Sequence, residues 1–180
     1  IAMNHSPELE KSVLGQLIGF KDLYFNVSDM LNEDCFYDEL HKVVYKAIVR
    51  VSKTTKIDVI TITEDILANK NSVPKFLRDS SINIPYEITT ICDTICTPDH
   101  INEHIFLLNE YRKKRSLLQL SVDVQNSLQD NSDPNEVIEK INSDIIKISE
   151  ISIHREMDMK SCLLSFGQML DKPVEDRIVP

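Results

Sequence analysis

The stretch TPDHINEHIFLLNEYRKKRSLLQLSVDVQNSL, residues 97–128, decides the fold of this 180-residue chain. Thr97 can cap a helix, and Pro98 suits the first helical position, where its missing N–H group costs no hydrogen bond. Neither Gly nor Pro occurs from residue 99 to residue 128. We therefore predict one helix of about 30 residues here, roughly 45 Å long at 1.5 Å per residue.

A second helix is predicted to follow at once, because QDNSDP, residues 129–134, is a strong turn signal that ends in a proline. Two long helices joined by so short a turn form an antiparallel hairpin. Apolar residues recur at helical spacing on both helices. They are Leu117, Leu120, Val124 and Leu128 on the first helix and Val137, Ile138, Ile141, Ile145 and Ile148 on the second. Such stripes most often pack within one chain, but this hairpin buries only part of them, so we predict self-association with a second copy.

Shorter helices are predicted in the first half of the chain. In SPELEKSVLG, residues 6–15, Ser6 can cap a helix that begins at Pro7. DELHKVVYKAIVRV, residues 38–51, carries a continuous apolar stripe at helical spacing, and residues 23–31 repeat the pattern over a shorter length. These segments predict a helical N-terminal region.

The next segments are less regular. KIDVITITEDILANK, residues 56–70, alternates like a strand at VITIT, but Asp58 can act as a cap and a helical face follows, so we favour a helix. Residues 69–85 are polar and broken by prolines, and we expect a loop around one short turn. Residues 86–96 are again predicted to be helical.

The composition favours an all-α globular chain. Only 3 Gly and no Trp occur, which is more typical of helices joined by polar turns than of a β-sandwich or barrel. The formal net charge of -9 argues against a surface built mainly to hold phosphates. Four cysteines without a secretory or long apolar segment predict a cytoplasmic chain with no membrane span.

The pattern changes again after residue 153. A short amphipathic helix is predicted within residues 159–171, with Cys162, Leu163, Phe166, Met169 and Leu170 on its apolar side. A helix of this length is unstable alone, so a docking surface must order it. We therefore predict a helical head over residues 4–97, a helical hairpin over 98–153 and a linker segment over 154–180.

Four stretches, in this order, resemble the N-terminal domain of DnaB-type replicative DNA helicases. They are SPELEKSVLGQLI (6–18), EDCFYDELHKVVYKAIVRV (33–51), KIDVITITEDI (56–66) and INEHIFLLNEYRKKRSLLQL (101–120). The resemblance implies a helical head, a helical hairpin and a linker helix, followed by a motor domain with a phosphate-binding loop. No G-x-x-x-x-G-K-[ST] run occurs in the chain, so we expect a fragment that stops before the motor.

The resemblance also implies partners and an assembly. In that family the hairpins pair, and three pairs form a collar on a hexameric ring that receives primase and often a helicase loader. Unwinding of DNA in the 5'-to-3' direction, with ATP and Mg, would belong to the motor domain. The linker residues Leu163, Phe166, Met169 and Leu170 would dock on the motor of a neighbouring subunit, although the linker could instead fold back on its own hairpin. The sequence departs from the family at residues 69–85, where a turn with Gly is usual and no Gly occurs.

Four possible metal ligands recur every four residues: Cys92, Cys96, His100 and His104. Thiolate and imidazole groups suit zinc, but this spacing spreads over about 18 Å of a straight helix, too far for one ion. We expect two buried thiols and two surface imidazoles, and no metal or cofactor in this part of the protein. No nucleophile elbow or other catalytic signature is present either, so enzymatic activity is not predicted for this chain itself.

The cluster Arg112, Lys113, Lys114 and Arg115 is the only dense basic run. It has two interpretations: a helix face that is solvated or paired with Glu110 and other acids, or a contact with nucleic acid or an acidic partner. A run of four charges supplies little of the counterion release that tight DNA binding needs.

A different function class stays open from the sequence. The chain could be a free-standing helical adaptor or helicase-loader-like protein, rather than a domain of a helicase. The two differ in whether the reading frame continues past Pro180 into a phosphate-binding loop.

Overall fold

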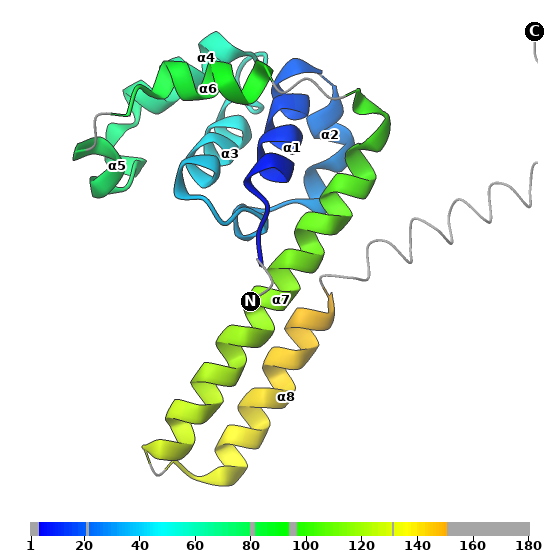
Figure 1. Cartoon of the computed structure of the whole chain (residues 1–180), viewed down its shortest axis with the longest axis vertical. Coiled ribbons are helices and arrows are strands. Elements are labelled where there is room, and N and C mark those ends of the chain that lie inside the picture. Colours follow the sequence, from blue (N-terminus) through cyan, green and yellow to red (C-terminus); the bar gives the residue numbers. More distant parts are fainter. Residues whose placement is uncertain (1–3, 21, 80–81, 94–96, 131, 151–180) are drawn as a thin grey trace, which may run out of the picture. The chain divides into compact units, whose positions relative to one another are not determined.

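The computed structural model describes residues 4–20, 22–79, 82–93, 97–130 and 132–150 (Figure 1). In these ranges every regular element is helical, which confirms the all-α fold class. The α-helices are α1 (Pro7–Gly19), α2 (Leu23–Val27), α3 (Glu39–Val51), α4 (Val59–Ala68), α5 (Lys75–Asp79), α6 (Ile84–Asp93), α7 (Ile101–Gln129) and α8 (Pro134–Glu150). Short 3₁₀ segments are η1 (Ser28–Met30), η2 (Glu33–Cys35), η3 (Lys70–Ser72) and η4 (Pro98–His100).

The chain forms two compact units, whose boundary in the sequence falls within α7. The head unit ends at Arg115, and the hairpin unit begins at Ser116 and is described as far as Glu150. The first half of α7 thus belongs to the same compact unit as α1 to α6. The predicted linker, residues 154–180, lies outside the described residues.

Capping residues set the starts of α1 and α4 as the sequence predicts, whereas Thr97 precedes the 3₁₀ segment η4 without a side-chain capping bond, and α7 begins at Ile101. The N–H group of Leu9 donates to Ser6 Oγ over 3.3 Å at the start of α1. At α4, Asp58 accepts from the N–H group of Thr61 over 2.8 Å, and Thr61 Oγ1 accepts from the N–H group of Asp58 over 3.1 Å. This reciprocal capping box, with Ile62 and Ile66 fully buried one turn apart, makes the VITIT run helical despite its alternation.

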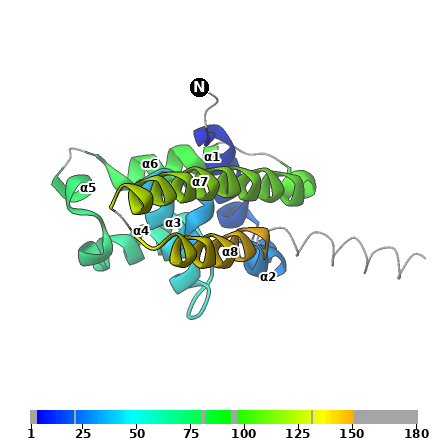
Figure 2. The same ribbon diagram turned by 90° about the horizontal axis from the view of Figure 1, so that it is seen from below.

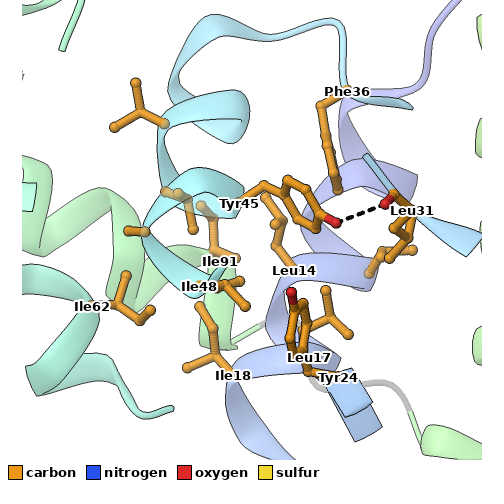
Figure 3. Packing of buried hydrophobic residues seen from close by; sticks show 14 of the residues in the cluster. Leu14, Leu17, Ile18, Tyr24, Leu31, Phe36, Tyr45, Ile48, Ile62 and Ile91 are labelled. Carbon is orange, nitrogen blue, oxygen red and sulfur yellow. Dashed lines mark hydrogen bonds between the residues drawn. The ribbon is translucent and has the colours of Figure 1, made fainter. Parts of the chain in front are cut away.

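The head unit has one hydrophobic core, and Figure 3 shows side chains of α1, α2, α3, α4 and α6 in it. The first half of α7 contributes Ile101, Ile105 and Leu108 to the same core. Helix α1 packs against α3 and α6, and α4 packs against α3 and α6. Fully buried side chains come from each helix: Val13, Leu14 and Leu17 from α1, Val44 and Ile48 from α3, Ile62 and Ile66 from α4, Ile88 from α6, and Ile105 from α7. The Tyr45 hydroxyl donates to the Leu31 carbonyl over 2.9 Å, and burial raises the pKa of this phenol (Figure 3).

Residues 69–85 contain more helix than expected. They hold η3, α5 and the start of α6, with Val73 and Leu77 buried as anchors. Helix α6 begins at Ile84 rather than at residue 86. Pro85 fits at the second position of this helix, because the first turn needs no hydrogen-bonded N–H group. The proline therefore lies in the first turn of a helix, although we expected it to interrupt helical structure.

Two glycines of α1 differ in what surrounds them. A Cβ atom built on Gly15 would lie 2.6 Å from the carbonyl oxygen of Ile91 in α6, closer than real Cβ contacts come. A Cβ atom built on Gly19 would have nothing within 4 Å. Gly15 therefore permits the close approach of α1 and α6, and Gly19 does not serve such a contact.

We predict that Gly15→Ala lowers the free energy of unfolding by about 1–3 kcal/mol, because the added methyl group forces apart two backbones. Gly19→Ala is the matched control, and it should leave stability unchanged or raise it by up to about 1 kcal/mol, the helix-propensity difference. Urea denaturation followed by circular dichroism measures both. A Gly15→Ala protein as stable as the wild type would contradict the close-packing role.

Candidate interaction surfaces

The hairpin unit is formed by the second half of α7 and by α8, which lie side by side in both views (Figures 1 and 2). Among the described residues of this unit, Val137 is the buried apolar one, and Leu120, Val124, Ile141 and Ile148 are half-buried. Four polar residues of the unit are half-buried as well: Ser116, Asp123, Ser127 and Asp144. The partly covered side chains of the hairpin unit are therefore a mixture of apolar and polar ones.

Large apolar side chains lie on the outside of the same unit. Each is between 47% and 59% exposed: Leu117, Leu118, Val122, Leu128, Ile138, Ile145 and Ile146. Four of these, at positions 117, 128, 138 and 145, belong to the predicted self-association set. The other four predicted positions, 120, 124, 141 and 148, are the half-buried ones.

The predicted stripe of α8 therefore divides into two faces. At roughly 100° per residue, the covered residues Val137, Ile141 and Ile148 fall within about 40° of one another around the helix. The exposed residues Ile138 and Ile145 lie about 80° to 100° from Val137. Sequence analysis missed Leu118, Val122 and Ile146. All three are apolar residues that fall outside the helical spacing of the predicted stripes, and this is the signal that could have found them.

Arg115, the last residue of the basic cluster, forms hydrogen bonds within the head unit. Its guanidinium donates to the backbone carbonyl of Asn4 over 2.9 Å, of Asp34 over 2.6 Å and of Cys35 over 3.2 Å. It also lies 5.8 Å from the centre of the Tyr37 ring. Burial lowers the pKa of Arg115 from its ordinary value. This side chain therefore holds the segment before α3 against α7.

The other members of the cluster have weaker or more exposed contacts. Arg112 lies 3.8 Å from Asp34, and Lys113 pairs with Glu110 over 3.0 Å, the acid expected from the sequence. Lys114 is exposed, with its ammonium 5.6 Å from the centre of the Tyr111 ring. The contact of all four residues with nucleic acid or an acidic partner stays a prediction, and Lys114 offers the freest charge for it.

A second polar attachment, which sequence analysis missed, joins α1 to the start of α3. The buried Glu10 carboxylate accepts from the N–H groups of Tyr37 over 2.9 Å and Asp38 over 3.3 Å, and its Oε2 lies 2.7 Å from Nδ1 of the buried His41. An acid in the first turn of a helix is ordinary, so its burial left no signal in the sequence. The contact satisfies two backbone donors of the segment that leads into α3.

The possible zinc ligands are spread over different surroundings. Cys92 is a half-buried free thiol, His100 is exposed beside Glu103 at 3.0 Å, and Cys96 lies outside the described residues. His104 is partly buried rather than on the open surface, because its Nδ1 atom lies 3.2 Å from Nε2 of Gln16 in α1. Within the described ranges no group of three or more His, Cys, Asp or Glu could hold a metal ion.

Two further sets of predictions meet the limits of the described residues. The linker-docking residues Leu163, Phe166, Met169 and Leu170 all lie outside them. Across the ranges that are described, no helix is both long enough and apolar enough to span a membrane.

We predict that Arg115→Ala destabilises the protein by about 1.5–3 kcal/mol, the usual contribution of hydrogen bonds that involve a charged group. Lys114→Ala, the adjacent exposed cation, is the matched control and should change stability by less than about 0.5 kcal/mol. Arg115→Lys should resemble the alanine variant, because an ammonium group cannot reproduce the planar fork that reaches three carbonyls. Chemical denaturation of the three variants measures these differences. Equal stability of the Arg115→Ala and Lys114→Ala proteins would contradict the fastening role.

Known proteins with similar sequences and structures fit this architecture. The crystal structure of the N-terminal domain of DnaB helicase from Mycobacterium tuberculosis superimposes with a TM-score of 0.67 at 22% identity, covering 80% of this chain and 98% of that one. A structure described as a DnaB-like replicative helicase and its interactions with primase gives a TM-score of 0.58 at 15% identity, covering 85% of this chain and 35% of that one. Likenesses at this level of identity support the all-α fold.

The sequence comparisons carry the assignment to a family. Replicative DNA helicase DnaB of Rhodothermus marinus is 21% identical over 150 residues, which are 82% of this chain and 15% of that protein. The chain thus spans about a seventh of the length of this curated relative. The family described as DnaB-like helicase N-terminal domain matches residues 2–110, more than half of the chain and nearly all of the head unit. The resemblance found in the sequence is confirmed, and the chain belongs to the family of DnaB-like helicase N-terminal domains.

Proposed function

We propose that this chain is the scaffold domain of a hexameric replicative DNA helicase, and that it assembles through its hairpin unit. The observation that carries the proposal is the set of exposed apolar side chains on α7 and α8, including Leu117, Ile138 and Ile145. A scaffold needs such a self-complementary surface, because a two-fold interface places the same patch on both subunits.

Packing within the hairpin unit cannot cover these side chains. Asp123 and Asp144 are among the half-buried residues of this unit, so its partly covered side chains are not all apolar. Large apolar side chains exposed in this number on one pair of helices favour an interface. A second hairpin laid against this surface would bury both copies of the patch. This is the pairing that we propose, with three such pairs in a hexamer.

Binding of primase and of a helicase loader forms the next part of the proposal. It is supported by membership of the family and by the fold shared with a DnaB-like helicase whose structure was determined with its primase interactions described. The activity of the whole protein, ATP-driven unwinding of DNA in the 5'-to-3' direction, is likewise proposed for a motor domain outside this sequence. The residues of the linker, Leu163, Phe166, Met169 and Leu170, are proposed to dock on a neighbouring motor.

We predict that the chain self-associates at high micromolar concentration and that Ile138→Asp with Ile145→Asp prevents it. Burial of each isoleucine contributes roughly 1.5–3 kcal/mol, so loss of both should weaken association by at least about a hundredfold. Sedimentation velocity measures the distribution of species for each protein.

The matched control is Asn142→Asp with Ser143→Asp, which adds the same charge at exposed polar positions of the same helix. It should associate nearly as well as the wild type. A wild-type chain that sediments only as a monomer, or a control that dissociates as fully as the isoleucine variant, would argue against the hairpin surface.

The proposed primase contact predicts that the helicase-binding domain of the cognate primase binds an assembled collar of these domains. Binding should weaken in the Ile138→Asp, Ile145→Asp variant if the primase site spans paired hairpins, and persist in the Asn142→Asp, Ser143→Asp control. Calorimetric titration measures the affinity, after sedimentation has shown that the collar is assembled. Absence of binding to an assembled wild-type collar would refute the contact.

A further inference from the structure

A cleft of about 470 Å³ lies in the head unit between α3 and the segment that contains α2 and η1. Tyr24, Ser28 and Leu31 line it on one side, and Tyr45, Val49 and Arg50 line it on the other. The volume falls within the range for sites that hold a whole ligand. None of the residues that line this cleft belongs to the hairpin surface or to the basic cluster described above.

The hydroxyl of Tyr24 gives the cleft a polar group that the described part of the protein does not use. Tyr24 is 8% exposed, and no described residue forms a hydrogen bond with its hydroxyl. The hydroxyl points to the side of Tyr45 (Figure 3), and burial, followed by the nearby Tyr24 phenol, raises the pKa of Tyr45. Unlike the amide oxygen of Gln16, which is buried without a partner, the Tyr24 oxygen is reached by solvent. A side chain that is almost wholly buried therefore brings an unpaired hydroxyl to the cleft.

A ligand that fills the cleft must bring its own polar group for this hydroxyl. In the open cleft water can serve the hydroxyl, but an apolar group that displaced the water would leave it unpaired, at a cost in free energy. The rest of the inner wall is apolar, with Leu31, Val49 and the ring of Tyr45. The cleft therefore suits an apolar body that ends in a polar tip.

The charged side chains that line the cleft are already paired. Lys46 forms an ion pair with Glu33, and Nε of Arg50 donates to Asp65 over 2.9 Å. The described wall therefore presents no unpaired charge that a ligand would have to match, and a neutral polar tip is sufficient.

We propose that the cleft binds the side chain of a tyrosine presented by a partner protein. A phenol hydroxyl can donate to the Tyr24 hydroxyl or accept from it, whereas the N–H group of a tryptophan can only donate. The ring of the incoming tyrosine would lie against Leu31 and Val49. Buried aromatic side chains of this kind are frequent anchors of protein interfaces.

The tyrosine has to come from another polypeptide. All five tyrosines of the chain lie in the described ranges, where Tyr24 and Tyr45 are the two that line the cleft, and the undescribed segments contain neither Tyr nor Trp. Asn32, also in the wall, favours a peptide over free tyrosine. Its Oδ1 accepts from the N–H group of Asp34 over 3.1 Å, but its Nδ2 has no described partner and can donate to a peptide carbonyl. Free tyrosine carries an ammonium and a carboxylate group instead, for which the described wall has no unpaired charge.

The test uses the full 180-residue chain labelled with ¹⁵N and three probes added in turn. The first is N-acetyl-tyrosine methylamide, and the second is the phenylalanine analogue, which lacks only the hydroxyl. The third is free tyrosine. Backbone chemical shifts locate each probe, and their saturation gives its affinity, which we expect in the millimolar range for a single side chain.

We expect the capped tyrosine probe to move the resonances of residues 24, 28, 31–33, 45–46 and 49–50 in a saturable way. It should bind roughly three- to tenfold more tightly than the phenylalanine probe, which is the contribution of one net hydrogen bond. Tyr24→Phe should abolish this preference, because it removes only the hydroxyl. The variant should be as stable as the wild type, since the hydroxyl has no described partner to lose. A purely structural role of Tyr24 would not change the ratio of the two affinities.

Ser28→Phe should close the cleft, with Ser28→Ala as its matched control. Loss of binding in the phenylalanine variant and its retention in the alanine variant would support the site, and the reverse pattern would refute it. Equal affinity of the two capped probes for the wild type, or a preference that persists in Tyr24→Phe, would also overturn the proposal. So would tighter binding of free tyrosine than of the capped probe, or absence of saturable shifts.

A second copy of the chain is the remaining source of a tyrosine, because Tyr86 is 65% exposed. Shifts at the cleft that grow with protein concentration without any probe, and that vanish in Tyr86→Phe, would assign the site to that second copy and overturn the proposed partner. Cleft resonances that do not depend on protein concentration would support it.

Discussion

The structure depends on the attachment of the first half of α7 to the rest of the head unit. Ile105 and Leu108 are buried in the core, and Asn109 Nδ2 donates to the Met30 carbonyl over 3.0 Å. One turn and a half further on, Arg115 reaches the carbonyls of the segment before α3. These bonds satisfy backbone acceptors of a connection that has little regular structure of its own, and unsatisfied acceptors there would be costly. The long helix is thus part of the head core before it becomes part of the hairpin.

The same helix changes its character after Arg115. Before that residue Ile101, Ile105 and Leu108 are buried in the head core and Leu107 is exposed. From Ser116 onward no apolar side chain of α7 is fully buried, and several are exposed. A helix that was optimised only for an isolated hairpin would have the opposite arrangement, with apolar residues at the seam and polar ones outside. The distribution along one helix therefore separates two tasks: stabilising the head and presenting a surface. The proposed pairing of hairpins rests on this second task.

Much of the fold followed from local sequence signals, because caps and apolar spacing act over a few residues. Ser6, Asp58 and the proline of QDNSDP each mark a helix start that the structure contains. What could not be predicted depends on contacts between distant residues. Glu10 finds its partners 27 to 31 positions away, and Arg115 bonds to a carbonyl 111 positions earlier. Likewise, the two faces of the α8 stripe could be separated only once the side covered by α7 was known.

The fate of the basic cluster shows why composition alone is a weak guide to a site. In a chain of net charge -9, a run of four cations stands out and suggests a contact with an anionic partner. In the folded chain Arg115 serves the protein's own structure, because its guanidinium donates hydrogen bonds to backbone carbonyls of the head unit.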